Sequence, residues 1–232
     1  EFCKAGITSI WTKDGDPGIT HVYEDLLRHD SLPVRTILDT CYTPFNRLAD
    51  IDAVAQRAAD IRAGGLPSGF LRGDGIKLLV DLPSDTHQAW LLEPYADGVN
   101  GCGQSVFPLD ELKAQVLAAD RLGLTVNLLT IGDRAVHEGL NLIERAIAEN
   151  PPRRRRHTLE HAEFIADADL QRFRALDVVP ILNWIGSYPE GGYQARFEGI
   201  LGADRIAARY QRWLNMIAAG IPFANGSDFP LG

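Results

Sequence analysis

The chain has 232 residues, of which 45% are hydrophobic and 23% are charged, a balance typical of a globular protein with ample material for a core. Its formal net charge of −8 argues against nucleic acid as a partner, because binding to phosphates requires a basic surface. No apolar run approaches the roughly 20 residues of a membrane-spanning helix, and no signal-peptide pattern is present, so we expect no membrane partner. The three cysteines are widely spaced and fit neither a disulfide scaffold nor a metal knuckle, which predicts a reduced, cytoplasmic protein.

Short apolar runs alternate with longer amphipathic stretches along the chain. The short runs are largely unbroken and partly β-branched, as expected for parallel strands that are buried on both faces. The predicted strands are Ile7–Trp11, Val34–Leu38, Ile76–Asp81, Thr125–Thr130, His157–His161, Val178–Asn183 and Pro222–Gly226. Apolar residues at three- and four-residue spacing predict helices over Thr20–His29, Ile51–Ala63, Leu109–Leu122, Arg134–Glu149, Ala168–Leu176 and Ala203–Ala219.

Local residue choices agree with these boundaries. Asp133 and Asp167 are predicted to cap the N-termini of two helices with their side chains. Gly123 and Gly220 stand just past two other helices, where a left-handed residue is favoured. The basic run Arg153–Arg156 is interpreted as a solvated connection after a helix.

Strands that alternate with helices imply a parallel sheet with crossover connections, either open and doubly wound or closed into a barrel. The glycine fingerprint of a dinucleotide-binding open sheet is absent, because Gly101 and Gly103 lie in a loop that leads to no helix glycine. This favours an α/β fold of the (β/α)8 TIM-type barrel, one strand short of completion. In that fold the chemistry lies at the C-terminal ends of the strands.

Two predicted strands end in residues that are suited to chemistry. Glu160 and His161 end one strand, where neighbours point to opposite sides. His161 is either a metal ligand or acid–base group, or a histidine satisfied by backbone hydrogen bonds. Asp228 follows the last apolar run after the turn made by Gly226 and Ser227. Its carboxylate is either a metal ligand that accepts a proton from bound water or a turn-forming residue.

Lys77 lies inside an apolar predicted strand, where an unpaired ammonium group is costly. It can form an ion pair with Asp81, four residues further on the same side of the strand, or extend to the surface. It can also form a Schiff base or carry CO₂ as a carbamate that bridges metals. The residues alone leave these alternatives open.

Five stretches, in this order, resemble the amidohydrolase superfamily: GIKLLVD, LLEPYAD, GLTVNLLTIGDRAV, RRHTLEHAEF and GIPFANGSDFP. The resemblance covers most of the chain from about Gly75 to Gly232, and AGITSI near the start also fits. The succession of IGDRA, EHA and GSD is similar to the branch called amidohydrolase family 3. That branch includes N-substituted formamide deformylases and exoenzyme regulatory proteins.

The resemblance implies a (β/α)8 barrel with a small β-sandwich domain, and an active site with one or two divalent metals, usually zinc. By position, Lys77 matches the strand-4 lysine, which is often carboxylated, His161 the strand-6 histidine and Asp228 the strand-8 aspartate. All three are then expected to be metal ligands, with Asp228 also the general base toward a metal-bound water. The implied activity is hydrolysis of C–N bonds of the amide type in small molecules.

The sequence departs from the family pattern in two places. Leu129 stands where the family has a strand-5 histidine, and leucine has no lone pair to give a metal. The strand-1 His-x-His pair has no counterpart, so residues 1–232 are expected to form strands 2 to 8 of a partial barrel, without the β-sandwich, as a piece of a longer protein. Three of the usual ligands remain, which predicts a weak metal site or an inactive chain. His137 is not expected to replace the missing ligand.

Two other functions stay open. The chain is a non-catalytic amidohydrolase-like protein with a binding or regulatory role if Leu129 abolishes the metal site. It is a Schiff-base barrel enzyme if Lys77 acts as an amine nucleophile. Trp184 and Tyr188 are expected to line the substrate pocket or to pack on the barrel rim. Open strand edges predict a homo-oligomer or association with the missing N-terminal segment.

Overall fold

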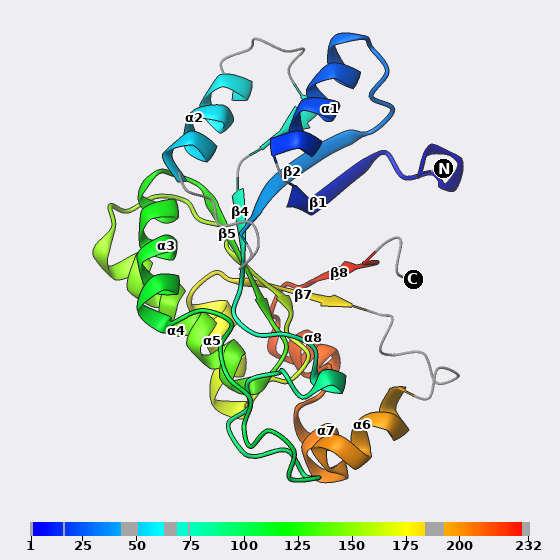
Figure 1. Ribbon diagram of the computed structural model, residues 1–232, viewed down its shortest axis with the longest axis vertical. Coiled ribbons are helices and arrows are strands. Elements are labelled where there is room, and N and C mark those ends of the chain that lie inside the picture. The colour runs from blue at the N-terminus through cyan, green and yellow to red at the C-terminus, as the bar shows by residue number, and fades with distance from the viewer. Residues whose placement is uncertain are drawn as a thin grey trace. The chain divides into compact units, whose positions relative to one another are not determined.

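The computed structural model describes residues 2–15, 17–42, 51–62, 69–73, 75–183 and 193–228. Its helices and strands are drawn in Figure 1. By its internal contacts the chain divides into two compact units. The first comprises Glu1–Leu78 and Leu117–Asn127, and the second comprises Leu79–Val116 and Leu128–Gly232. Each unit is described by itself.

The first unit is built around one parallel strand, β2, which pairs with β1, β3 and β4. Six of its eight residues are buried, including five in succession, so the strand packs on both faces as the sequence predicts. The elements are η1 (Phe2–Ala5), β1 (Ser9–Gly15), α1 (Pro17–Arg28), β2 (Arg35–Tyr42), α2 (Ile51–Arg62), β3 (Leu71–Arg72) and β4 (Gly75–Leu79).

The second unit contains three further parallel strands, in which β7 pairs with β6 on one side and β8 on the other. Its elements are η2 (Ser84–Thr86), α4 (Asp133–Glu149), β6 (Thr158–His161), α5 (Asp167–Ala175), β7 (Val179–Asn183), α6 (Tyr193–Leu201), α7 (Ala203–Arg209), α8 (Trp213–Ala219) and β8 (Ala224–Gly226). Two elements, α3 (Leu109–Arg121) and β5 (Thr125–Thr130), are divided between the units, and the last residue of β4, Leu79, belongs to the second.

The strands are hydrogen-bonded in the order β1-β2-β4-β5-β6-β7-β8, with β3 beside β2. Strands adjacent in this order are also successive along the chain, apart from the two-residue β3. This arrangement confirms the predicted α/β class, in which each parallel strand returns through a crossover.

The predicted strands and helices are all present, with ends that shift by a few residues. The sequence patterns missed β3 and α6, and they joined α7 and α8 into one helix. The break occurs because residues after α7 pair with the segment after β6: Gln211 donates its backbone N–H to Glu163 O at 2.7 Å. Gln211 also has a positive φ of 40°, which no helix accommodates.

Two predicted helix caps are correct and two are wrong. Gly123 and Gly220 have positive φ angles of 83° and 64°, as expected past a helix end. The N-cap residues of α4 and α5 are instead Gly132 and Ala166, and neither makes a side-chain capping bond. Asp133 and Asp167 were predicted for those positions, but they lie inside the helices and bind distant arginines.

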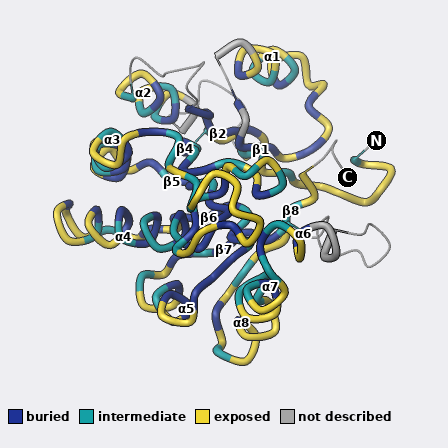
Figure 2. The backbone as a smooth tube through the Cα atoms, turned by 60° about the horizontal axis from the view of Figure 1, so that its bottom comes forward, coloured by how far each residue is buried: buried dark blue, intermediate teal, exposed yellow. Residues whose placement is uncertain are grey.

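Each unit has its own apolar core. In the first, Leu27 and Leu32 pack with Leu38 of β2 and Leu71 of β3. In the second, α4 buries one side while its opposite side is exposed (Figure 2). The second unit also contains an apolar cluster that joins the connection between residues 82 and 107 to the ends of β5 and β6 and to α6 and α7. Its buried members are Ala89, Leu91, Tyr95, Ile131, Phe164, Phe197, Leu201 and Ile206.

The 82–107 connection is held against the rest of the second unit by close backbone contacts. A Cβ on Gly132 would lie 2.1 Å from Trp90 O, and the N–H groups of Arg134 and Ala135 both donate to that oxygen. Within the connection, a Cβ on Gly103 would lie 2.1 Å from Ala89 O. Glycine is therefore required at both positions for steric reasons.

Replacing Gly103 tests this close approach, because Gly98 offers a matched control in the same connection. Both have positive φ, 67° and 77°, but a Cβ on Gly98 would meet nothing within 4 Å. We expect Gly98→Ala to lower the free energy of unfolding by about 1–2 kcal/mol, from the left-handed backbone alone. Gly103→Ala should cost about 1–3 kcal/mol more from overlap with Ala89 O. Equal losses in urea unfolding would contradict the packing argument.

Candidate functional site

Lys77 lies in the middle of β4 in the first unit and is half-buried. Its register partner in the neighbouring strand is Cys41 of β2. The chain thus places a basic side chain within a parallel pair of strands, as predicted. The ion pair with Asp81 stays a prediction.

The first unit also contains a buried polar group that the sequence patterns did not single out. Asp39 of β2 is 1% exposed, and its Oδ2 accepts hydrogen bonds from Trp11 Nε1 at 2.6 Å and Asn127 Nδ2 at 2.9 Å. A Cβ on Gly75 would lie 2.8 Å from the same carboxylate. The Lys13 ammonium stands 4.0 Å from the centre of the Trp11 ring. Asp39 and Asn127 are polar residues within apolar strands, and this pattern could have identified the group from the sequence.

His161 ends β6 in the second unit, with a positive φ of 65°. Its side chain is 18% exposed, and its Nδ1 lies 3.1 Å from Asn183 Nδ2 and 3.6 Å from Glu163 Oε1. Two polar side chains therefore lie beside this ring nitrogen. A left-handed backbone is uncommon for a histidine, and it changes the direction in which the side chain leaves the strand end.

Asn183, which sequence reasoning missed, connects the ends of three strands. It ends β7 and lies beside His161 of β6, and a Cβ on Gly226 of β8 would lie 2.7 Å from its Oδ1. Asp228 follows β8 by two residues and is exposed, with a φ of 53°. The C-terminal ends of β6, β7 and β8 thus bring together His161, Asn183 and the segment that leads to Asp228.

Leu129 on β5 is half-buried and packs against the apolar cluster of the second unit. Its neighbours there come from the 82–107 connection and from α6 and α7. An aliphatic side chain suits these surroundings, because burying a polar ring against apolar groups without partners costs free energy. The position is therefore adapted to packing.

Asp81 is a fully buried carboxylate that joins three segments of the second unit. Its oxygens accept hydrogen bonds from the backbone N–H groups of Trp90 at 2.8 Å, Ile131 at 2.7 Å and Gly132 at 2.8 Å. Burial raises the pKa of this carboxyl from 3.8 to about 7, although the three N–H donors oppose the rise. The carboxylate fixes the start of the 82–107 connection to the turn between β5 and α4.

Two aromatic residues of the 82–107 connection and His137 of α4 make contacts within the fold of the second unit. Tyr95 is buried and donates its hydroxyl to Ala89 O at 3.0 Å, so it belongs to the core. The Arg134 guanidinium lies 5.4 Å from the centre of the Trp90 ring. His137 contacts Asp169 at 3.0 Å and so connects α4 to α5. Trp184 and Tyr188 lie outside the described residues.

The described residues do not by themselves fit a complete metal site. Among them, no group of three His, Cys, Asp or Glu side chains is placed to hold a metal ion. His161 and Asp228 belong to the second unit and Lys77 to the first. Their assignment as a ligand set stays a prediction.

Solved structures with the same fold were found by comparison. A metal-dependent hydrolase from Pyrococcus horikoshii OT3 matches 99% of this chain with a TM-score of 0.77 and 21% identity, over 43% of its own length. One from Pyrococcus furiosus matches with a TM-score of 0.75 and 22% identity, over 44% of its length. At these identities the matches establish the fold class alone.

The model of the amidohydrolase family matches residues 1–232, so the chain belongs to the amidohydrolase family. Protein LONG AFTER FAR-RED 3 of Arabidopsis thaliana is 28% identical over 198 residues, 85% of this chain and 32% of that protein. YtcJ of Bacillus subtilis (strain 168), which carries an amidohydrolase name, is 29% identical over 174 residues, 72% of this chain and 30% of that protein. The chain therefore spans about a third of the length of these relatives.

The pH dependence of stability tests the state of Asp81. Between pH 3.8 and about 7 the folded carboxyl keeps a proton that the unfolded one has lost. Its contribution is therefore full below that window and is lost as the pH rises through it, by about 1.4 kcal/mol per unit at most. Asp81→Asn cannot titrate, so the unfolding free energy of the wild type minus that of the variant should fall from pH 5 to pH 8.

The comparison needs urea unfolding at each pH and a control carboxylate on the same unit. Asp204→Asn on the exposed side of α7 serves this purpose. A wild-type-minus-variant difference for Asp81→Asn that rises with pH would mean that the N–H donors outweigh burial.

Proposed function

We propose that this chain is part of a metal-dependent hydrolase that cleaves C–N bonds of the amide type in small molecules. The observation that carries the proposal is the match of the amidohydrolase family model to all of residues 1–232. The end of β6 supports it, because His161 is held there in a partly exposed position beside Asn183 and Glu163. The metal-dependent hydrolases of similar fold are consistent with this class of reaction.

The proposed ligands are those that the family pattern implies. Lys77, His161 and Asp228 would hold a divalent metal, which we propose is zinc, with Lys77 carboxylated and Asp228 as general base. The metal would supply an activated water. In the second unit, the end of β7 places Asn183 between β6 and β8, which supports a role for this strand-end region in the site.

We further propose that the sheet is part of a (β/α)8 barrel whose remaining strand and β-sandwich domain lie outside these 232 residues. The parallel strand order supports this architecture. So does the match to less than half of each hydrolase from Pyrococcus. The three cysteines form no disulfide, which agrees with a proposed location in the reducing cytoplasm. Among the described residues, no helix is long and apolar enough to cross a membrane.

A second candidate function is that of a non-catalytic binding or regulatory protein. Leu129 favours it, because this side chain packs in the apolar cluster instead of offering a lone pair. The two candidates differ in one measurable property, since only the hydrolase requires bound metal. The metal content of the chain therefore separates them.

Metal analysis by plasma mass spectrometry is the primary test. We expect the purified chain to bind about one zinc when it is offered at micromolar concentration, and His161→Ala or Asp228→Ala to lose most of this binding. His137→Ala is the matched control, because this histidine of α4 contacts the buried Asp169 of α5 and is not a proposed ligand. Leu129→His should increase metal retention if β5 faces the same site.

Activity on small formamides should follow the metal content in the same variants. Retention of zinc in wild type and control, with loss in the two ligand variants, supports the hydrolase. Absence of zinc from every form, even when it is offered at micromolar concentration, would favour the non-catalytic alternative.

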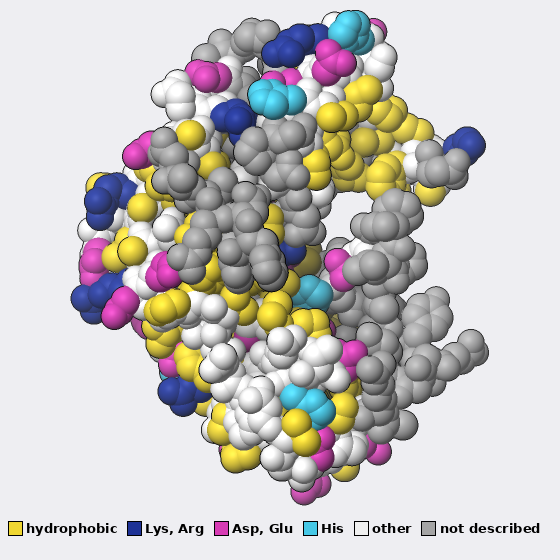
Figure 3. Space-filling model, in the orientation of Figure 1, with side chains coloured by type: hydrophobic (Ala, Val, Ile, Leu, Met, Phe, Trp, Pro, Cys, Tyr) yellow, Lys and Arg dark blue, Asp and Glu magenta, His cyan; other side chains and the backbone are white. Residues whose placement is uncertain are grey.

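The partner of β1 is a separate proposal. Among the described residues β1 pairs with β2 alone, and hydrophobic side chains gather over β1 and the residues before it (Figure 3). Ile7 is 40% exposed and Trp11 36% exposed. An exposed apolar edge strand favours pairing with another strand. We propose that it pairs with a second copy of the chain or with a further segment of the whole protein.

Light scattering coupled to size exclusion tests the edge. We expect the 232-residue chain to form dimers or larger species, and Ile7→Lys to shift the population toward monomer, because a charge on an edge disfavours pairing. Val22→Lys on α1 is the control, since Val22 is 58% exposed away from the strand edge. A monomeric wild type would contradict the proposal.

A further inference from the structure

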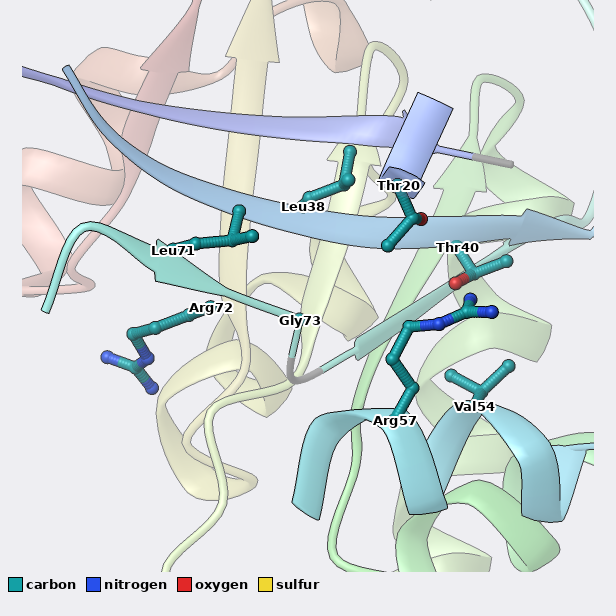
Figure 4. Close-up of a pocket in the computed structure, with 8 residues that line it drawn as sticks. All are labelled: Thr20, Leu38, Thr40, Val54, Arg57, Leu71, Arg72 and Gly73. Atoms are coloured by element: carbon teal, nitrogen blue, oxygen red, sulfur yellow. The ribbon is translucent and has the colours of Figure 1, made fainter. Parts of the chain in front are cut away.

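A small pocket in the first unit lies between the strands and the two helices α1 and α2 (Figure 4). Its walls combine aliphatic, hydroxyl and guanidinium side chains, and none of the lining residues is acidic. The lining residues are Thr20, Leu38, Thr40, Val54, Arg57, Leu71, Arg72 and Gly73. Its deepest part has room for about one water-sized group, and its mouth is open to solvent.

Thr40 presents its hydroxyl to this pocket (Figure 4). It lies on β2, the residue as a whole is 6% exposed, and its side chain makes no hydrogen bond with any other described residue. A hydroxyl group can donate and accept hydrogen bonds, so this one is available to a ligand in the pocket. Thr20 of α1 lines the same pocket and is 5% exposed.

Arg57 supplies a positive charge to the pocket. It reaches from α2 toward Thr40, whereas Arg72, on the other side of the pocket, points away from both (Figure 4). Within the described part of the chain the Arg57 guanidinium forms no ion pair or hydrogen bond, and it is half-buried. A guanidinium is always charged and offers paired N–H donors that match the oxygens of a carboxylate or phosphate.

We propose that this pocket binds a small oxyanion, a carboxylate or phosphate group, between Arg57 and the Thr40 hydroxyl. One oxygen fills the water-sized depth and accepts a hydrogen bond from Thr40, while the charge faces Arg57 near the mouth. The aliphatic walls, Leu38, Val54 and Leu71, offer no competing acceptor. Both polar groups gain a partner that the described residues do not provide.

Calorimetric titration of the chain with inorganic phosphate and with acetate, at constant ionic strength, tests the proposal. At least one of the two anions should bind at a single site. Arg57→Gln should weaken that binding at least tenfold, because it removes a charge-assisted hydrogen bond. Arg72→Gln is the matched control and should change the affinity less than twofold.

Thr40→Val gives an independent test, because it removes the hydroxyl and keeps the shape of the side chain. We expect weaker anion binding together with an unfolding temperature that is little changed without anion, since no described residue loses a hydrogen-bond partner. Binding of phosphate alone or acetate alone supports the proposal and names the preferred group.

Three results would overturn it. Neither anion binds, or Arg57→Gln binds as tightly as the wild type, or Arg72→Gln loses as much affinity as Arg57→Gln. Anions also stabilise proteins by exclusion from their surface, which raises the unfolding temperature of all variants alike. A rise of equal size in wild type, Arg57→Gln and Thr40→Val would therefore also count against a site.

Discussion

The second unit depends on one buried carboxylate. Asp81 accepts hydrogen bonds from the backbone N–H groups of Trp90, Ile131 and Gly132. It thereby joins the segment after β4 to the 82–107 connection and to the turn into α4. The same turn also contacts the segment after β6, because Ile131 O accepts a hydrogen bond from the backbone N–H of Phe164. A single ionisable group thus determines where the end of β6, with His161, lies relative to β5. Burial without these donors would be prohibitively costly, so the backbone and the carboxylate require each other.

Leu129 has a physical explanation in this arrangement. The 82–107 connection, once fixed by Asp81, brings Ala89, Leu91 and Tyr95 to the side of Leu129. Asp133 strengthens the same arrangement by accepting the Leu92 N–H at 2.8 Å and an Arg209 guanidinium N–H. An apolar residue is stabilised in that environment by burial, and a metal-binding side chain would need polar partners there. The departure from the family pattern is therefore consistent with the packing around it.

Most of the secondary structure could be predicted from the sequence, because apolar periodicity reports burial and burial positions strands and helices. The caps could not, since a local pattern cannot show that Asp133 is recruited by Leu92 and Arg209 from other segments. The break at Gln211 has the same origin, a backbone bond to Glu163 across the unit. His161 was singled out correctly as a strand-end residue, but Asn183 beside it was missed because an asparagine after an apolar run also suits a turn.

Strand β2 carries polar residues on both faces. The surroundings of Asp39 indicate a structural role, whereas those of Thr40 indicate a role in binding. Asp39 on one face is bonded by Trp11 and Asn127, and Gly75 leaves the room that its carboxylate needs. Its neighbour Thr40 points to the opposite face, as alternation requires, into a pocket where described residues give its hydroxyl no partner. Asp39 is thus held by hydrogen bonds that stabilise the fold. The Thr40 hydroxyl and the facing Arg57 have no such partner among the described residues, so they are available to the proposed ligand.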